Sequence, residues 1–416
     1  MSPSKDSTFE NADLAPEVGG RLSRQASRLI TRLVGKLAYG RLRIVTPFGL
    51  SITQTGEADG PEATIVLRNW RALRRVISGG DIGFAEGFIE GDWTSPDRVA
   101  LIRLFARNTD AIKATIRGSR LVRAFSRIKH RMRDNTKRGA RRNIEAHYDL
   151  GNEFYRLWLD EAMVYSSAIY DASTATLEQA QAAKLAQVGK LLDLKGGERV
   201  LEIGCGWGAL AKHLAREAGA HVTGITLSPS QLAFAKETLV EPEVKDKVDL
   251  RLQDYRDLEG QFDRVVSIEM FEAVGEAFWP SYFTTLRRSM AAGGRAVLQV
   301  ISIAEDRYED YRRDTDFIQA HVFPGGFLPS KATFTKAVER AGLTVAAAEH
   351  FGLSYAETLA EWRSRFNQNW SKIALLGFDE KFRRLWNYYL EYCEAGFREG
   401  AIDVSLYTLV PQEVQP

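Results

Sequence analysis

Cysteine is scarce in this chain, and long apolar runs are absent. Among 416 residues there are two cysteines, Cys205 and Cys393, too few for a disulfide scaffold, which predicts a reducing, cytoplasmic setting. No stretch approaches the ~18 consecutive apolar residues of a membrane span, so any membrane contact should be peripheral. The N-terminus shows no signal-peptide pattern. Six histidines and two cysteines show no metal-ligand spacing, and we expect no metal.

Acidic residues are missing from one segment of the first third and nearly so from another. None occurs in residues 19–43, where basic residues recur every three or four positions and predict a helical stripe: Arg21, Arg24, Arg28, Arg32 and Lys36. Residues 117–143 hold eleven Lys or Arg against the single acid Asp134. A solvated helix face is the ordinary interpretation of such a run, with an anionic membrane surface or nucleic acid as alternatives. Interleaved apolar residues, without any nucleic-acid module signature, favour lipid.

The middle of the chain alternates strand and helix patterns from about residue 185. "GERVLEIGCGWGALAKHLARE" indicates a buried strand, a glycine turn and a helix that opens at Ala209. In the next unit Ser228 is placed as the N-cap before Pro229. This alternation predicts an α/β fold with a doubly wound, mostly parallel sheet, which binds ligands beyond the carboxyl ends of its strands.

The glycine turn alone is a weak signal. Its spacing, G-C-G-W-G, differs from the G-x-G-x-x-G of dinucleotide-binding folds. An apolar strand followed by E-I-G-x-G-x-G is instead typical of methyltransferases that use S-adenosylmethionine (SAM). The second strand of such enzymes usually ends in an acid, whereas here it ends in Thr226.

Seven motifs in order make the resemblance specific. They are "HYDLGNEFYRLWLDEAMVYSSAIY" (147–170), "LEIGCGWG" (201–208), "GITLSPSQ" (224–231), "LQDYRD" (252–257), "SIEMFEAVG" (267–275), "FPGGFLPS" (323–330) and "FGLSYAETLAEWRSRF" (351–366). Together they resemble the cyclopropane-fatty-acyl-phospholipid synthase family, which includes mycolic acid cyclopropane synthases and related fatty-acyl C-methyltransferases. The resemblance covers roughly residues 20–410, the N-terminal third more loosely.

The resemblance implies a fold and a division into domains. The fold would be a class I SAM-dependent methyltransferase: α/β, Rossmann-like, doubly wound, mostly parallel with an antiparallel last strand, plus a smaller N-terminal domain. The expected parts are a flexible leader (1–18), a lipid- or membrane-associated domain (19–116), a basic helical linker (117–143) and the catalytic domain (144–416). The substrate would be the double bond of unsaturated phospholipid acyl chains. The enzyme would be cytoplasmic, peripheral on the inner face of the membrane, free of nucleic acid and a homodimer.

The resemblance also assigns residues to the cofactor SAM. Tyr165 and Ser166 would close over it, and Gly204, Cys205 and Gly206 would lie along its methionine part. The segment Thr226, Leu227, Ser228 to Gln231 would hold the ribose and carboxylate side. Gln253 and Asp254 would flank the adenine. The alternative for each is a capped helix or a satisfied turn.

In this family a bound bicarbonate is the base that completes ring closure. Of the positions that hold it, Glu272, Tyr355 and the backbone of Ile301 match this sequence. The family's cysteine and histidine are replaced by Ser167 and Gln299, so bicarbonate binding and ring closure come into question more than methyl transfer does. We expect Glu269 to pair locally. The segment "YRRDTDFIQAHVFPGG" suits the wall of an acyl tunnel.

The sequence leaves three functions open for this chain. The first is SAM-dependent C-methylation of unsaturated acyl chains, giving a methyl-branched, methylated unsaturated or cyclopropane product. The replaced His and Cys favour a product other than a cyclopropane. An RNA or small-molecule methyltransferase is the second, and a non-catalytic lipid-binding protein with this fold is the third. For Gln299 we expect a place facing the reacting double bond, with a core amide bonded to backbone as the alternative.

Overall fold

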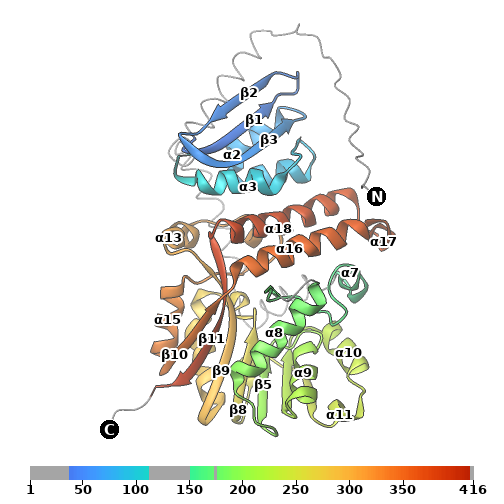
Figure 1. Cartoon of the computed structure of the whole chain (residues 1–416), viewed down its shortest axis with the longest axis vertical. Helices are drawn as coiled ribbons and strands as arrows, with labels where there is room; N and C mark the ends of the chain where they lie inside the picture. The colour runs from blue at the N-terminus through green and yellow to red at the C-terminus, as the bar shows by residue number, and fades with distance from the viewer. Residues whose placement is uncertain (1–36, 112–149, 173–175, 413–416) are drawn as a thin grey trace.

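The computed structural model describes residues 37–111, 150–172 and 176–412, which form two separate β-sheets (Figure 1). The predicted leader, the basic stripe from Arg21 to Lys36 and the basic linker at 117–143 lie outside the described residues. Within the described ranges, no helix combines the length and the hydropathy that crossing a membrane requires.

The N-terminal domain is a small sheet covered by two helices. Its strands run in the order β2-β1-β3-β4. The elements are β1 (Tyr39–Val45), β2 (Ser51–Thr55), β3 (Ala58–Leu67), α2 (Arg71–Ile89), β4 (Trp93–Thr94) and α3 (Arg98–Arg107). Alternation along β1 buries Leu42 and Ile44 on the face that α3 covers. Helix α2 continues past a kink at Gly80, where φ is 60°, and ends at Ile89.

The second sheet has seven strands in the order β10-β11-β9-β8-β5-β6-β7. They are β5 (Arg199–Ile203), β6 (His221–Thr226), β7 (Val248–Leu252), β8 (Phe262–Ile268), β9 (Met290–Ile303), β10 (Leu343–His350) and β11 (Ile402–Pro411). Strands β7, β6, β5, β8 and β9 are mutually parallel, and β11 is antiparallel to β9 and β10. The predicted doubly wound sheet with an antiparallel last strand is confirmed.

Helices pack on both faces of this sheet, which explains its apolar strands. The α-helices of this part of the chain, of which some cover the sheet and others lie beyond its edge, are α7 (Asn152–Arg156), α8 (Leu177–Leu192), α9 (Ala209–Glu217), α10 (Pro229–Thr238), α11 (Pro242–Lys245), α12 (Trp279–Ser289), α13 (Glu305–Arg313), α14 (Phe317–His321), α15 (Lys331–Arg340), α16 (Gly352–Gln368), α17 (Trp370–Leu375) and α18 (Glu380–Arg398). Adjacent residues of β5 point to opposite layers: Val200 packs with α8 and α9, and Leu201 with α12 and α15. As predicted, α9 begins at Ala209, and the Ser228 hydroxyl caps α10.

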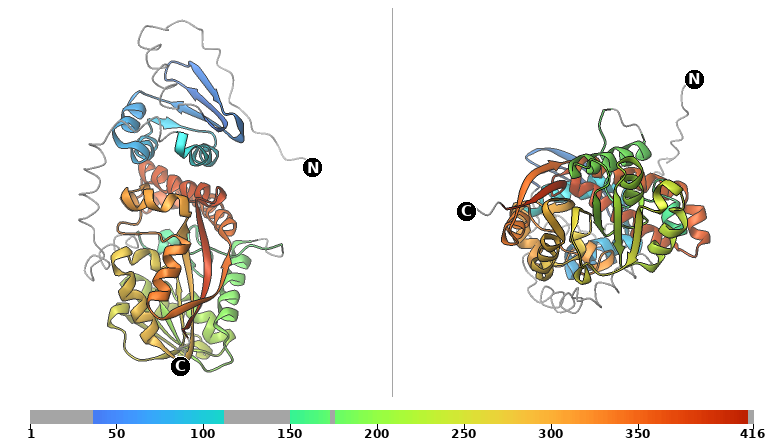
Figure 2. Two further views of the ribbon diagram at one scale, coloured as in Figure 1. Left: turned by 90° about the vertical axis from the view of Figure 1, so that its left-hand side faces the viewer. Right: turned by 90° about the horizontal axis from the view of Figure 1, so that it is seen from below.

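Helices α16 and α18 lie between the two sheets and carry the N-terminal domain (Figures 1 and 2). Helix α18 packs against α3 and α2. Arg98 of α3 donates from Nε and Nη2 to the two carboxylate oxygens of the buried Glu391, each at 2.6 Å. Arg103 and Arg107 of the same helix both pair with Glu399. Bidentate, partly buried pairs of this kind fix orientation, so the two domains are held in a defined arrangement.

Candidate active site

A single large cavity extends from the carboxyl edge of the seven-stranded sheet into the N-terminal domain. Its volume is about 1000 Å³, at the upper end of the range for ligand pockets. On the side of the seven-stranded sheet it is walled by residues at or just after the ends of β5, β6, β8 and β9. From the N-terminal domain come apolar side chains of β1, β3, α2 and α3: Leu42, Ile44, Ile65, Leu67, Phe84 and Phe105. The segment predicted to shape an acyl tunnel, residues 311–326, contains the end of α13 and the whole of α14, and several of its residues line the cavity.

Most of the residues that the resemblance assigns to SAM lie in this wall. They are Tyr165, Ser166, Gly204, Cys205, Gly206, Thr226, Leu227, Gln231 and Gln253. The backbone of this turn requires glycine, because φ is 87° at Gly204 and 52° at Gly206. A Cβ at Gly204 would also lie 3.0 Å from Met270 Cγ. The turn therefore brings bare backbone to the cavity, as close approach of a ligand needs.

The end of β6 is organised by Thr226. Its hydroxyl donates to Gln231 Oε1 at 3.0 Å and accepts from the Ser228 amide at 3.1 Å. Two predicted SAM contacts are absent from the cavity wall. Ser228 uses its hydroxyl to cap α10, and Asp254 forms an ion pair of 2.6 Å with Arg256. Their contacts with the cofactor stay predictions.

A buried lysine supports the cavity wall, and the sequence reasoning missed it. Lys184 of α8 donates from Nζ to Ser166 Oγ at 2.8 Å. Burial lowers the pKa of Lys184 to about 8, against the opposing effect of Glu269, Asp160 and Glu202. Its position on the apolar face of α8, seven residues after buried Leu177, was the available signal.

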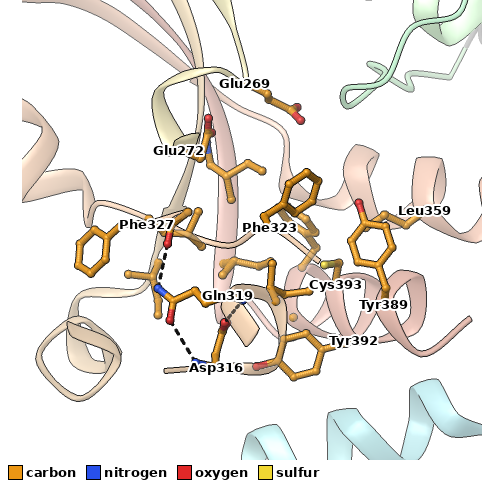
Figure 3. Close-up of a pocket in the computed structure, with 18 of the residues that line it drawn as sticks. Glu269, Glu272, Asp316, Gln319, Phe323, Phe327, Leu359, Tyr389, Tyr392 and Cys393 are labelled. Carbon is orange, nitrogen blue, oxygen red and sulfur yellow. Dashed lines mark hydrogen bonds between the residues drawn. The ribbon is translucent and has the colours of Figure 1, made fainter. Parts of the chain in front are cut away.

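Two glutamates form the polar end of the cavity. Glu269 directly follows β8, and Glu272 lies in the next turn; both are in the cavity wall (Figure 3). Glu269 Oε1 accepts from the Ser167 amide at 2.9 Å and from Gln299 Nε2 at 2.6 Å. Glu269 Oε2 accepts from the Tyr355 hydroxyl at 2.7 Å. Glu272 accepts from the Ile301 amide through Oε1, while its Oε2 has no hydrogen-bond partner among the described residues.

The surroundings of the two glutamates separate their protonation states. Burial first, and the neighbouring Glu269 second, raise the pKa of Glu272 to about 8. Burial also raises the pKa of Glu269, but the donors Ser167, Tyr355 and Gln299 oppose that shift. Donors aimed at a carboxylate favour its charged form. Near neutral pH, Glu272 therefore keeps its proton, while the three donors around Glu269 favour its carboxylate form against the effect of burial.

The predicted catalytic residues divide into two layers. Glu272, Tyr355 and Ile301 line the cavity. Gln299 and Ser167 are fully buried and are not among the lining residues; both stand behind Glu269. The structure thus does not place Gln299 against the substrate space, and its amide is bonded mainly to a side chain rather than to backbone.

The expectation that Glu269 pairs locally is wrong. Its three partners lie 102, 30 and 86 positions away in the chain. It is a charged residue at the end of a strand that is buried on both faces and borders the site, which was the signal in the sequence.

Residues 135–407 match the family described as mycolic acid cyclopropane synthetase. This chain belongs to that family. Its relatives include tuberculostearic acid methyltransferase UfaA1 of Mycobacterium tuberculosis, 37% identical over 402 residues, 94% of this chain and 93% of that protein. The cyclopropane-fatty-acyl-phospholipid synthase of Escherichia coli K12 is 34% identical over 376 residues, 87% of this chain and 90% of that protein. The crystal structure of mycolic acid cyclopropane synthase CmaA1 complexed with SAH and CTAB matches with a TM-score of 0.61 and 30% identity, covering 65% of this chain and 97% of that one.

Membership of the mycolic acid cyclopropane synthetase family confirms the resemblance inferred from the seven motifs. The chain is a SAM-dependent methyltransferase that modifies unsaturated fatty acyl chains. The left-handed glycine turn and the Thr226–Gln231 pair beside it suit the methionine and ribose parts of SAM. When bound there, SAM supplies an electrophilic methyl group.

Proposed function

We propose that this enzyme methylates the double bond of an unsaturated acyl chain of a membrane phospholipid. The proposed product is a methyl-branched or methylated unsaturated chain rather than a cyclopropane. The observation that carries the proposal is the single cavity. It joins the wall assigned to SAM, the Glu269–Glu272 pair and an apolar extension into the N-terminal domain.

The shape and lining of this cavity suit an acyl chain. A hydrocarbon chain offers no hydrogen-bonding groups, so only apolar contacts can hold it, and the side chains of β1, β3, α2 and α3 supply them. A double bond is a weak nucleophile that needs close alignment with the methyl donor and exclusion of water. A cavity walled by both the seven-stranded sheet and the N-terminal domain suits both requirements.

Aromatic rings line the part of the cavity near the glutamates. Tyr165, Tyr355 and Tyr389 belong to the wall, and the hydroxyls of Tyr165 and Tyr389 lie 3.0 Å apart. Addition of a methyl group to a double bond leaves positive charge on the chain, and ring faces attract a cation. These rings support chemistry through a carbocation without requiring a base before methyl transfer.

Residues 167 and 299 support a product other than a cyclopropane. Gln299 is a neutral amide, and its Nε2 is already bonded to Glu269. The Ser167 hydroxyl donates to the carbonyl of Ala168, 2.9 Å away. Neither side chain offers the cavity a free donor for an external anion of the kind that completes ring closure.

The place of action is part of the proposal. A phospholipid substrate stays in its bilayer, so the enzyme would act while peripherally bound to the inner face of the cytoplasmic membrane. The name of the Escherichia coli relative, a fatty-acyl-phospholipid synthase, supports this substrate. The basic residues 117–143 would contribute attraction to anionic headgroups. A homodimer remains a prediction.

The experiment is incubation of the enzyme with SAM and vesicles of unsaturated phospholipid, followed by mass spectrometry and proton NMR of the fatty methyl esters. The mass should rise by one CH₂ unit, and olefinic or methyl-branch signals should appear without cyclopropane signals. Cyclopropane as the main product would overturn the product assignment. No mass gain on any unsaturated phospholipid would overturn the function.

A further inference from the structure

The backbone at Glu269 is in a conformation that ordinarily belongs to glycine. Its φ is 47°, a left-handed value that costs a residue with a side chain ~1–2 kcal/mol. Strained residues of this kind persist where the surrounding structure holds them, and they cluster at functional sites. The strained backbone at Glu269 is therefore tolerated at a position whose carboxylate forms part of the cavity wall.

The hydrogen bonds of this carboxylate leave one oxygen available. A carboxylate offers about four lone-pair sites. Oε1 is occupied by two donors, the Ser167 amide and Gln299 Nε2. Oε2 accepts a single bond, from the hydroxyl of Tyr355, which also lines the cavity. Oε2 therefore has a site left for a proton, whereas Oε1 is used to hold the group in place.

The neighbouring acid does not compete for this role. Burial, with the neighbouring Glu269 second, raises the pKa of Glu272 to about 8, so Glu272 keeps its proton near neutral pH. The three groups bonded to Glu269 all donate to it, which favours its carboxylate form. Its Oε1 is bonded to the backbone at Ile301. Of the two glutamates in the wall, Glu269 is the one poised to accept a proton.

We propose that Glu269 is the base of the reaction: its Oε2 takes the proton that the methylated acyl chain must lose, in place of a bound bicarbonate. This rests on the proposed function. Gln299, Tyr355 and the chain at residue 167, the positions that the family resemblance assigns to bicarbonate, are instead the donors that hold Glu269. The Glu269 carboxylate thus takes the place that a bound bicarbonate would otherwise occupy.

The step balances without a further reactant. Methyl addition leaves a carbocation on the acyl chain. A C–H bond adjacent to the cationic carbon breaks, and its electron pair forms a new C=C bond, either a methylene group or a double bond along the methylated chain. The proton passes to Glu269 Oε2. The carboxylate is restored when that proton leaves to water as the product departs.

The test compares wild type with Glu269→Gln and Glu269→Gly, using SAM and unsaturated phospholipid vesicles. Glutamine keeps the shape but cannot take the proton, so product formation should fall ~10²–10⁴-fold, the usual contribution of a general base. SAM binding, measured by calorimetry, should be unchanged. The wild-type rate should be the same in carbonate-free buffer and with added bicarbonate.

The glycine variant provides a rescue. It removes the carboxylate and suits the left-handed backbone, so the protein should remain folded. Formate or bicarbonate added to Glu269→Gly should restore part of the lost product formation, and the same salts should not restore Glu269→Gln, whose side chain fills the space. The matched control is Asp193→Gly, at another non-glycine residue with a positive φ, 53°, which ends α8 away from the cavity. It should leave activity unchanged.

The outcomes separate the two proposals. If wild type methylates no unsaturated phospholipid, the proposed function fails and this inference fails with it. If wild type methylates but Glu269→Gln forms product at a similar rate, or if the wild-type rate requires bicarbonate, Glu269 is not the base while the proposed function stands.

Discussion

The two ends of the cavity are built on opposite principles. At the sheet end, Glu269 accepts three hydrogen bonds and Glu272 accepts one from the Ile301 amide, and these bonds orient both carboxyl groups. At the N-terminal end, side chains such as Ile65 and Leu67 offer only apolar surface. Directional bonds fix a reaction at one point, while apolar surface selects a length and shape of chain. Substitutions at the first end should change the rate, and substitutions at the second should change which chain reacts.

The largest expected effect on stability comes from weakening the contact between the N-terminal domain and helix α18. Arg98→Ala removes both bonds to buried Glu391 and the contact of the guanidinium with the Phe88 ring, 4.9 Å from its centroid. Loss of one partner of such a pair costs about 2–5 kcal/mol, although Arg363 still contacts Glu391. Urea unfolding should show this loss, and methylation of long chains should fall while SAM binding persists.

The control for that variant is Arg313→Ala. Its pair with Glu309 is exposed on both sides, so it should cost no more than ~1 kcal/mol. Equal stability of the Arg98 and Arg313 variants would mean that the ion pair does not hold the domains together.

The second effect tests the polar end. Tyr355→Phe removes the donor to Glu269 Oε2, a bond to a charged group, worth ~1.5–3 kcal/mol. Product formation should fall ~10–100-fold, with little change in the KM for lipid. Tyr392→Phe is the control, because Tyr392 lies at the opposite side of the same pocket, near Asp316 (Figure 3). If both variants lose activity equally, the loss reflects packing of the cavity rather than the bond to Glu269.

The third effect tests the apolar end. Ile65→Phe adds bulk to the wall from β3. Turnover of the longest acyl chains should fall about tenfold relative to shorter ones, within the range that one methylene contributes to selectivity. Competition between phospholipids of different chain length, followed by mass spectrometry, measures the ratio. Leu50→Phe, at an exposed leucine of the same domain, should leave it unchanged. An unaltered ratio in Ile65→Phe would mean that the chain does not reach β3.

The sequence predicted the fold well and the site only partly, for a physical reason. Strand and helix patterns and caps are local, so the opening of α9 at Ala209 and the cap at Ser228 were predictable. The partners of Glu269 come from three distant segments, and its left-handed backbone is not visible in residue letters. Gln299 was expected to face the reacting double bond, whereas it is buried behind Glu269, a partner that could be found only in three dimensions.

The smallest expected effect is the pH dependence that Glu272 gives to the free energy of unfolding. The pKa of Glu272 is raised to about 8 in the folded chain from 4.5. Between these values the folded state holds a proton that the unfolded state has released, so the stabilisation is complete below 4.5 and is lost as the pH rises toward 8. The difference in unfolding free energy between wild type and Glu272→Gln should fall by about 1.4 kcal/mol per pH unit in this window. Urea titrations at pH 6 and pH 7 measure it. A difference independent of pH would mean that Glu272 is ionised in the fold, and the division of proton and charge between the two glutamates would be lost with it.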